Sequence, residues 1–310
     1  MAEDEFALID WIRARSRPRP GVIRGIGDDC AVVRPTEGFD LLVTTDMLMD
    51  GRHFHLEEAG PEAVGYKALG VNLSDIAAMA GIPRSATVAV ALPRSDSAAI
   101  ARGLHRGMMQ LATEFDVALI GGDTNVWDGG LVISITVLGE TTASGVVLRS
   151  GARPGDVVCV TGPLGGSRAG RHLRPRPRIR EARAIHSLAP IRAMIDISDG
   201  LASDLGHILQ ESGNLGAEID EDLIPIHEDV ASVATTDGRS DLDHALTDGE
   251  DFELCMVLDP ADFERLSRQP ELTSWLIRVG TIEQEPGLRL RSAGGRIRPY
   301  EARGFNHFTS

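Results

Sequence analysis

The chain has 310 residues, about twice the size of a typical domain, and this length predicts two domains. Hydrophobic residues make up 42% and charged residues 25%, a balance that excludes a wholly disordered or collagen-like chain. The formal net charge of -15 argues against a nucleic-acid-binding protein, because phosphate contacts need clustered cations. Lys67 is the only lysine among 31 lysine and arginine residues, a bias that we attribute to genome composition.

The three cysteines, Cys30, Cys159 and Cys255, lie far apart in apolar, strand-like runs. No C-x-x-C motif is present, so we expect three reduced core thiols rather than a disulfide framework. The acidic start carries no apolar segment typical of a signal peptide. No run approaches the roughly 18 apolar residues that predict a membrane span. The sequence therefore favours a cytoplasmic protein without a membrane anchor.

The first half of the chain predicts a mixed α/β unit. Apolar residues at helical spacing near the start predict a short leading helix that ends before the Arg- and Pro-rich stretch at 15–20. In chain order we then expect strands at 30–33 and 41–45, a helix beginning at Pro61, a strand at 87–92, a helix including 100–111, and strands at 117–120 and 131–138. The resulting ββαβαββ order ends near Glu140.

A second unit follows a turn that begins at Ser150-Gly151. We expect strands at 157–160, 194–197, 252–258 and 277–282, and a helix at 200–211. The stretch 162–180 is rich in Gly, Arg and Pro, which predicts a loop or a broken helix. The predicted domains are 1–149 and 150–310, both of the α/β (α+β) class.

Aspartates recur at the ends of apolar strands and at loop–helix junctions. A single aspartate of this kind is most often a helix N-cap, but a whole series is harder to explain as caps. If their loops converge, the carboxylates repel one another unless cations lie between them. Clustered hard oxygen ligands suit Mg²⁺. The positions are Asp28, Asp29, Asp46, Asp75, Asp123, Asp196, Asp199, Asp248 and Asp251.

This pattern favours phosphoryl transfer with several Mg²⁺ ions. A Walker A motif is excluded because the only lysine follows Tyr66, and the chain has no G-x-G-x-x-G loop. Gly121-Gly122-Asp123-Thr124 offers bare backbone to a phosphate while Asp123 holds a metal; a plain turn is the alternative. His53 and His55 have the spacing of two zinc ligands on a strand, but no nearby Cys or third His supports zinc. The alternatives for His53 are a structural role, at the surface or in the core, and a contact with the substrate.

A series of ordered motifs resembles the thiamine-monophosphate kinases, a family of the aminoimidazole-ribonucleotide-synthetase-like superfamily. The matching stretches run almost end to end and include Gly25-Ile-Gly-Asp-Asp29, Thr44-Thr-Asp46, Gly51-Arg-His53-Phe54, Tyr66-Lys-Ala-Leu-Gly-Val-Asn-Leu-Ser-Asp75, Ile120-Gly-Gly-Asp-Thr124, Ile195-Asp-Ile-Ser-Asp-Gly-Leu201, Gly249-Glu-Asp-Phe-Glu-Leu254 and Gly304-Phe305. Each motif alone is weak, whereas their order along one chain is specific.

The resemblance implies a two-domain fold of the superfamily type, homodimeric through residues 1–140. The implied reaction is phosphorylation of thiamine monophosphate to thiamine diphosphate by direct transfer, with ATP as co-substrate. The implied ligands of several Mg²⁺ ions are Asp29, Thr44, Thr45, Asp46, Asp75, Asp123, Asp196 and Asp199. The implied nucleotide contacts are Gly122, Asp123, Arg149 and Ser198, and Asp46, Asp123 and Arg149 are the implied catalytic residues. The implied substrate contacts are His53, Glu250 and Phe305.

The chain departs from the family pattern at two places. The segment after Gly162 lacks roughly one helix that the family has at this place. We expect this difference to alter the local structure and the rim of the nucleotide site. Asp248 stands where the family has glycine, so an extra carboxylate is expected near the substrate side. The rival functions are a selenophosphate or aminoimidazole-ribonucleotide synthetase of the same superfamily, and a non-catalytic nucleotide- or metal-binding scaffold.

Overall fold

A computed structural model describes residues 11–16, 19–24 and 32–301. The chain forms two compact units: unit 1 comprises Met1–Ile76, Gly81–Ala143 and Leu173–Pro175, and unit 2 comprises Ala77–Ala80, Ser144–His172 and Arg176–Ser310. The predicted boundary at 149/150 stays a prediction. None of the helices in the described part of the chain is long and apolar enough to cross a membrane.

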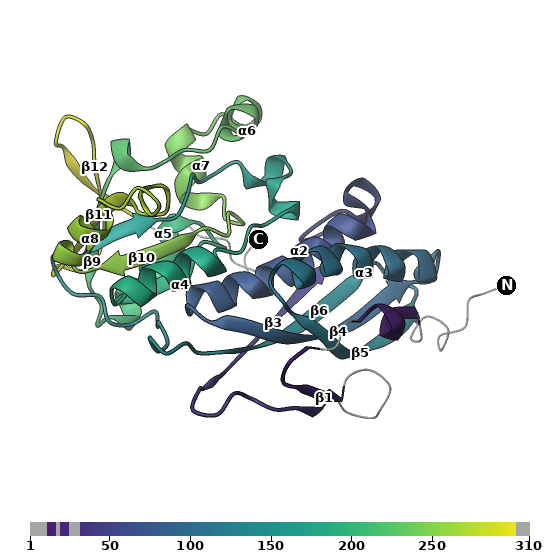
Figure 1. Cartoon of the computed structure of the whole chain (residues 1–310). Helices are drawn as coiled ribbons and strands as arrows, with labels where there is room; N and C mark the ends of the chain where they lie inside the picture. The colour runs from purple at the N-terminus through teal and green to yellow at the C-terminus, as the bar shows by residue number, and fades with distance from the viewer. Residues whose placement is uncertain (1–10, 17–18, 25–31, 302–310) are drawn as a thin grey trace. The chain divides into compact units, whose positions relative to one another are not determined.

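Unit 1 is built on a four-stranded sheet with the order β3-β6-β4-β5. Its strands are β3 (Leu41–Met49), β4 (Ile82–Pro93), β5 (Ala118–Trp127) and β6 (Val132–Glu140). All neighbours are antiparallel except β4 and β5, which are parallel and joined by a crossover helix. Two helices, α2 (Leu56–Ala78) and α3 (Ser97–Glu114), lie side by side on one face of this sheet (Figure 1). A short ribbon of β1 (Val22–Arg24) and β2 (Val32–Val33) precedes it.

Two glycines allow α2 and α3 to pack with their backbones in contact. A Cβ atom at Gly65 would lie 2.1 Å from the Leu104 carbonyl oxygen, and one at Gly107 would lie 1.8 Å from that of Glu62. Such distances exclude any side chain at these two positions. The long helix also bends at Gly60, whose φ is 73°, directly before Pro61. The sequence prediction of a helix beginning at Pro61 therefore matches the straight part of α2.

The second face of the unit 1 sheet is open and apolar at β3. Residues alternate between the two faces of a strand, so every second residue of β3 points away from the helices. Val43 is 62% exposed and Met47 57%, and Leu41 and Met49 continue the row. A monomeric protein rarely leaves such a row in water, so this open face, defined by Leu41, Val43, Met47 and Met49, is a candidate interface.

Unit 2 contains a seven-stranded sheet with the order β13-β12-β9-β11-β7-β10-β8. The strands are β7 (Val157–Val160), β8 (Ala193–Asp196), β9 (Gly216–Asp220), β10 (Leu254–Leu258), β11 (Ile277–Glu283), β12 (Gly287–Arg291) and β13 (Ile297–Tyr300). The helices are α4 (Ile179–Leu188), α5 (Leu201–Glu211), α6 (Val230–Asp237), α7 (Asp241–Thr247) and α8 (Pro260–Leu266). The pairing is antiparallel except between β9 and β12.

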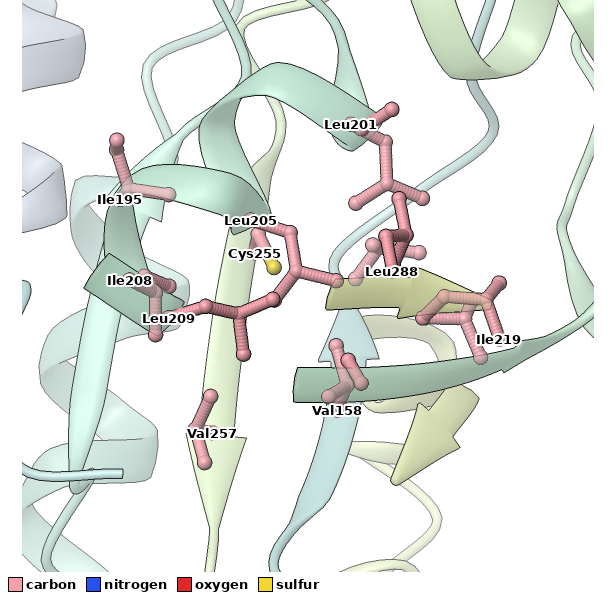
Figure 2. Packing of buried hydrophobic residues seen from close by; sticks show 14 of the residues in the cluster. Val158, Ile195, Leu201, Leu205, Ile208, Leu209, Ile219, Cys255, Val257 and Leu288 are labelled. Atoms are coloured by element: carbon pink, nitrogen blue, oxygen red, sulfur yellow. The ribbon is translucent and has the colours of Figure 1, made fainter. Parts of the chain in front are cut away.

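The core of unit 2 forms where α5 packs on the sheet. Figure 2 shows Leu205, Ile208 and Leu209 of α5 gathered with strand residues such as Val158 and Val257, all of them buried. Truncation of a leucine in such a core costs about 2–5 kcal/mol, because the surroundings fill the cavity only partly. Cys159 and Cys255 are free thiols within the strands, which confirms the predicted state for these two; Cys30 lies outside the described residues.

The segment expected to be a loop or broken helix consists of two short turns, η1 (Ser167–Ala169) and η2 (Arg171–Leu173), before α4 begins at Ile179. Side chains from a later loop hold the start of this segment. Asp251 accepts hydrogen bonds from the Gly165 amide at 3.0 and 3.1 Å, and Asp248 accepts one from the Gly166 amide at 2.9 Å. The shortened segment is thus fixed by buried carboxylates rather than by a longer helix.

Candidate active site

In unit 1 a strand and a helix bring two of the predicted acidic residues together. Thr44 and Asp46 lie on the side of β3 that faces the helices, and Asp75 lies near the end of α2. The Thr44 hydroxyl donates a hydrogen bond to the Asp75 carboxylate. Thr45 points to the opposite face, where its hydroxyl donates to the Ile135 carbonyl at 3.2 Å and accepts from Thr136 at 3.0 Å. The Thr45 side chain is therefore not part of this Asp46–Asp75 pair.

Electrostatic repulsion within the pair is visible in the pKa of Asp46. Burial and then the nearby charge of Asp75 raise the pKa of Asp46 from 3.8 to about 6. The ionised form of Asp46 is thus destabilised in this site, and a bound cation would stabilise it. The donor set, one hydroxyl and two carboxylates, consists of hard oxygen atoms, and Mg²⁺ is typically held by one or two carboxylates together with water and phosphate oxygens.

Asp123 lies within strand β5 and not after its end, where the sequence analysis expected it. Strand β5 continues beyond Ile120 to Trp127, because its parallel pairing with β4 runs on to Pro93. Asp123 is exposed within this strand, and its carboxylate accepts a hydrogen bond from the side-chain amide of Asn125 at 3.2 Å. Gly122 is required beside it, since a Cβ atom there would lie 2.0 Å from the Val88 carbonyl oxygen. A strand edge without side-chain bulk is accessible to a large ligand.

The predicted convergence of four carboxylates in unit 1 stays a prediction. Asp29 lies outside the described residues. Among residues 11–16, 19–24 and 32–301, no three His, Cys, Asp or Glu side chains form a group that could hold a metal ion by themselves. The Asp46–Asp75 pair is thus the part of the predicted metal site that the structure describes.

His53 lies in the turn that joins β3 to α2. The His53 Nδ1 atom accepts a hydrogen bond from the Met49 amide at 3.0 Å, and its carbonyl oxygen accepts one from the Lys67 ammonium at 2.7 Å. Asp50 caps the following helix by accepting from the Leu56 amide at 2.9 Å. These contacts fix the turn between the strand that carries Asp46 and the helix that carries Asp75.

In unit 2 the ends of two paired strands bring four predicted site residues together. The register aligns Asp196 of β8 with Leu254 of β10, so the residues after β8 run beside those before β10. The Glu250 amide donates to the Ser198 carbonyl at 2.7 Å, which places the two loops in direct contact. Asp196, Ser198, Asp199 and Glu250 therefore form one cluster within unit 2.

The loop that carries Ser198 and Asp199 is held by a residue to which the sequence analysis gave no role. The Asp204 carboxylate, on α5, accepts hydrogen bonds from both the Ser198 and the Asp199 amide at 3.0 Å. Burial, followed by the charge of Asp196, raises the pKa of Asp204 to about 8. The signal in the sequence was the stretch Ser203-Asp-Leu-Gly-His207, which also matches the family pattern but gives Asp204 no specific role.

The Glu250 loop has an unusual backbone. Gly249, Glu250 and Phe252 have φ values of 71°, 53° and 53°, and a Cβ atom at Gly249 would lie 2.5 Å from the Ser198 carbonyl oxygen. A left-handed conformation at a residue other than glycine costs about 1–3 kcal/mol and is common at ligand sites. Phe305 lies outside the described residues, and Arg149 is exposed in the segment before β7.

Asp248, the extra carboxylate, contributes to the structure of this loop. Its oxygens accept from the Gly166 amide and from Arg239, the latter at 2.9 Å, and lie 2.9 and 3.0 Å from His244 Nδ1. This set of contacts links the shortened segment to helix α7. The expectation that Asp248 alters the substrate contacts is not tested by these contacts, but they give the residue a structural role.

Sequence comparisons define the class of the protein. The AIR synthase related protein N-terminal domain matches residues 27–141, and the C-terminal domain of the same name matches residues 163–292. The fold is therefore the two-domain fold that the sequence motifs predicted.

Individual relatives narrow this class. The thiamine-monophosphate kinase of Rhodopirellula baltica is 39% identical over 313 residues, which cover 98% of this chain and 97% of the relative. The crystal structure of the enzyme of that name from Stenotrophomonas maltophilia is 35% identical, covers 94% of this chain and 97% of its own, and has a TM-score of 0.80. AaThiL complexed with AMPPCP and TMP is 32% identical, with 98% and 97% coverage and a TM-score of 0.76. The chain belongs to the thiamine-monophosphate kinase family.

Proposed function

We propose that this protein transfers the terminal phosphoryl group of ATP to thiamine monophosphate, forming thiamine diphosphate. The observation that carries the proposal is the Asp46–Asp75 pair with its Thr44 hydrogen bond, in a chain that aligns with thiamine-monophosphate kinases over nearly its full length. The rival superfamily activities lack this support, because the aligned relatives carry the kinase name.

In unit 1, the proposed task is to bring phosphate groups and cations together. Asp46 and Asp75, with Thr44, would hold Mg²⁺, and Asp29 and Asp123 complete the proposed set of side-chain ligands. The Thr45 side chain lies on the opposite face of β3, so Thr45 could join this set only through its main-chain oxygen. Bound Mg²⁺ supplies neutralisation of the phosphate charges during transfer. Gly122 supports a nucleotide contact, since its bare backbone allows a phosphate to approach β5.

In unit 2, the proposed task is recognition. Ser198 and Arg149 are proposed contacts of the nucleotide, with Asp196 and Asp199 as further metal ligands. Arg149 is a suitable partner of the phosphate chain because its planar guanidinium forms paired hydrogen bonds with phosphate oxygens. Glu250 is proposed to contact the cationic ring system of the substrate, together with Phe305.

The reaction requires no general base. The attacking atom is an oxygen of the substrate phosphate, which is already ionised at neutral pH. The obstacle is the repulsion between two anions that must meet in line. In unit 1, a donor at His53 Nε2 is suited to an oxygen of the acceptor phosphate. In unit 2, the guanidinium of Arg149 is suited to the phosphate chain of ATP, and we propose direct transfer without a phosphoenzyme.

Product analysis tests the proposal directly. The purified protein is incubated with ATP, MgCl₂ and thiamine monophosphate, and the products are separated by anion-exchange chromatography. We expect equimolar ADP and thiamine diphosphate, and none when EDTA replaces MgCl₂. ATP binding without any product would support the scaffold alternative, whereas ADP formation without thiamine diphosphate would indicate another acceptor.

We further propose that the protein is a cytoplasmic homodimer that pairs through unit 1. The exposed row on the open face of β3 supports the pairing, because a second copy would bury Val43 and Met47. The buried free thiols Cys159 and Cys255 suit a reducing compartment, where ATP is also available.

A further inference from the structure

The only lysine of the chain is completely buried. Lys67 has a relative exposure of 0%, whereas the other cationic residues are all arginine. A composition bias toward arginine acts at every position where the two residues are interchangeable. Retention of one lysine against this bias indicates a position at which a guanidinium does not fit.

The surroundings of Lys67 give the physical reason. The residue lies in α2, and its ammonium reaches the carbonyl oxygen of His53 in the preceding turn at 2.7 Å. An ammonium is a compact point charge on a flexible stem, while a guanidinium is wider and planar. Within a closely packed interior, the added volume of arginine would displace the turn that it has to support.

The turn above Lys67 sets the state of the His53 ring. The Met49 amide donates to Nδ1 at 3.0 Å, and the Met49 carbonyl accepts from the amides of Arg52 and His53 at 3.2 and 3.0 Å. An Nδ1 atom that accepts a hydrogen bond carries no proton, so the neutral ring in this contact has its proton on Nε2. His53 thereby has one ring donor, Nε2–H, suited to an anionic phosphate oxygen.

We propose that Lys67 is a positioning residue for His53: by holding the His53 carbonyl it keeps the turn closed, the ring on the Met49 amide and Nε2–H directed to the acceptor phosphate. The inference rests on the proposed function for the identity of that phosphate, but the effect on the ring is independent of turnover.

A double-mutant cycle separates positioning from general stability. The variants are Lys67→Met, which keeps volume without the charge, His53→Gln, and the two combined. We expect Lys67→Met to raise the KM for thiamine monophosphate about tenfold, the effect of one lost charge-assisted contact. The KM for ATP should change less than about twofold, and in the His53→Gln background Lys67→Met should add less than about twofold.

Two further variants complete the kinetic test. Lys67→Arg is expected to raise the KM for thiamine monophosphate as well, because arginine keeps the positive charge but its wider guanidinium does not fit beneath the turn. Thr36→Val is the matched control, since it removes another side-chain hydrogen bond of unit 1, to Glu140 at 2.7 Å, in which the turn that carries His53 takes no part. Wild-type kinetics in Lys67→Arg, or additive effects of Lys67→Met and His53→Gln, would overturn the proposal.

Imidazole NMR gives an answer that does not depend on catalysis. In protein labelled with ¹⁵N-histidine, the His53 signal is assigned by its loss in His53→Gln, and long-range correlations report which ring nitrogen carries the proton. Wild type should show the Nε2–H form, and Lys67→Met a mixture of both forms. Should Lys67→Met be unfolded, Lys67→Gln serves the same purpose. An unchanged Nε2–H signal in a folded variant contradicts the proposal even if the protein proves not to phosphorylate thiamine monophosphate.

Discussion

Without bound metal, Asp75 is expected to destabilise unit 1 through its repulsion of Asp46. The pKa of Asp46 is raised from 3.8 to about 6, and each pKa unit corresponds to about 1.4 kcal/mol, so the total penalty on ionised Asp46 is about 3 kcal/mol. Burial is the larger cause and the charge of Asp75 the smaller one. We therefore assign about 1 kcal/mol to the pair repulsion.

The sign of the pH dependence follows from linkage. Because the pKa of Asp46 is higher in the folded state, the folded protein binds the proton more tightly than the unfolded chain between pH 3.8 and about 6. Stability falls as pH rises through this window, and the full penalty is present above it. Asp75→Asn removes the repulsion but keeps an oxygen that accepts from the Thr44 hydroxyl.

Asp75→Asn should therefore stabilise the metal-free protein while it destroys activity. In EDTA at pH 8 we expect the melting temperature to rise by roughly 2 °C, the effect of about 1 kcal/mol in a protein of this size. The gain should shrink toward pH 4. Turnover at saturating MgCl₂ should fall at least about 100-fold, since a proposed metal ligand is lost.

Thermal unfolding in EDTA and in MgCl₂, together with the product assay, measures both effects. Asp128→Asn is the control, because it neutralises an aspartate of unit 1 whose side chain is 83% exposed. That control should shift neither quantity. A melting temperature of Asp75→Asn below that of wild type in EDTA would refute the repulsion argument, and near-normal turnover would refute the shared-metal role.

Three further changes test other parts of the structure. Glu253→Gln should destabilise unit 2 by about 3–5 kcal/mol in urea unfolding, because it breaks a buried pair with Arg178 at 2.8 Å. The control is Glu264→Gln, at an exposed pair with Arg268. A loss of stability below about 1 kcal/mol in Glu253→Gln would contradict this reasoning. Met47→Asp on the open face should give a monomer by light scattering, while Ile297→Asp in unit 2 leaves the mass unchanged; a dimeric Met47→Asp or a monomeric wild type would exclude this interface. Asp248→Asn should lower stability by about 1–3 kcal/mol and leave the KM for thiamine monophosphate within about twofold, and a larger KM change would give Asp248 a role in substrate contact.

Local periodicity was sufficient to predict much of the fold. The predicted strand at 157–160 coincides with β7 and the predicted helix at 200–211 with α5. The order of elements from β2 to β6 in unit 1 was also correct. These elements have continuous apolar runs or a clear helical stripe. By contrast, β1, β9, β12 and β13 were not predicted. Strands such as β12 (Gly287–Arg291) mix charged and apolar residues and depend on pairing partners distant in sequence.

The geometry of the candidate site was less accessible from sequence. Asp123 was expected after the end of a strand at 117–120, but pairing with β4 extends β5 past the two glycines, so that Asp123 lies within the strand. Thr45 was grouped with Asp46, whereas strand alternation sends its side chain to the opposite face. The left-handed backbone at Glu250 and Phe252 has no local sequence signal, because only the pairing with the Ser198 loop imposes it.

The recurring aspartates now separate into two kinds with different physical roles. Asp204 and Asp251 are buried and accept hydrogen bonds from backbone amides, those of Ser198 and Asp199 in one case and of Gly165 in the other. Asp123, in contrast, is exposed on its strand. A carboxylate that holds a loop needs amide donors and exclusion of water, while one that binds a metal must remain accessible to it. The two kinds share the same residue type in the same kind of motif, so sequence does not distinguish them. Burial alone does not either, since the proposed ligand Asp196 is only 5% exposed; the hydrogen bonds from backbone amides mark Asp204 and Asp251. Acids outside the proposed ligand set therefore hold the site loops of unit 2. The acids proposed to bind ligands lie on these loops or on strands of the two sheets.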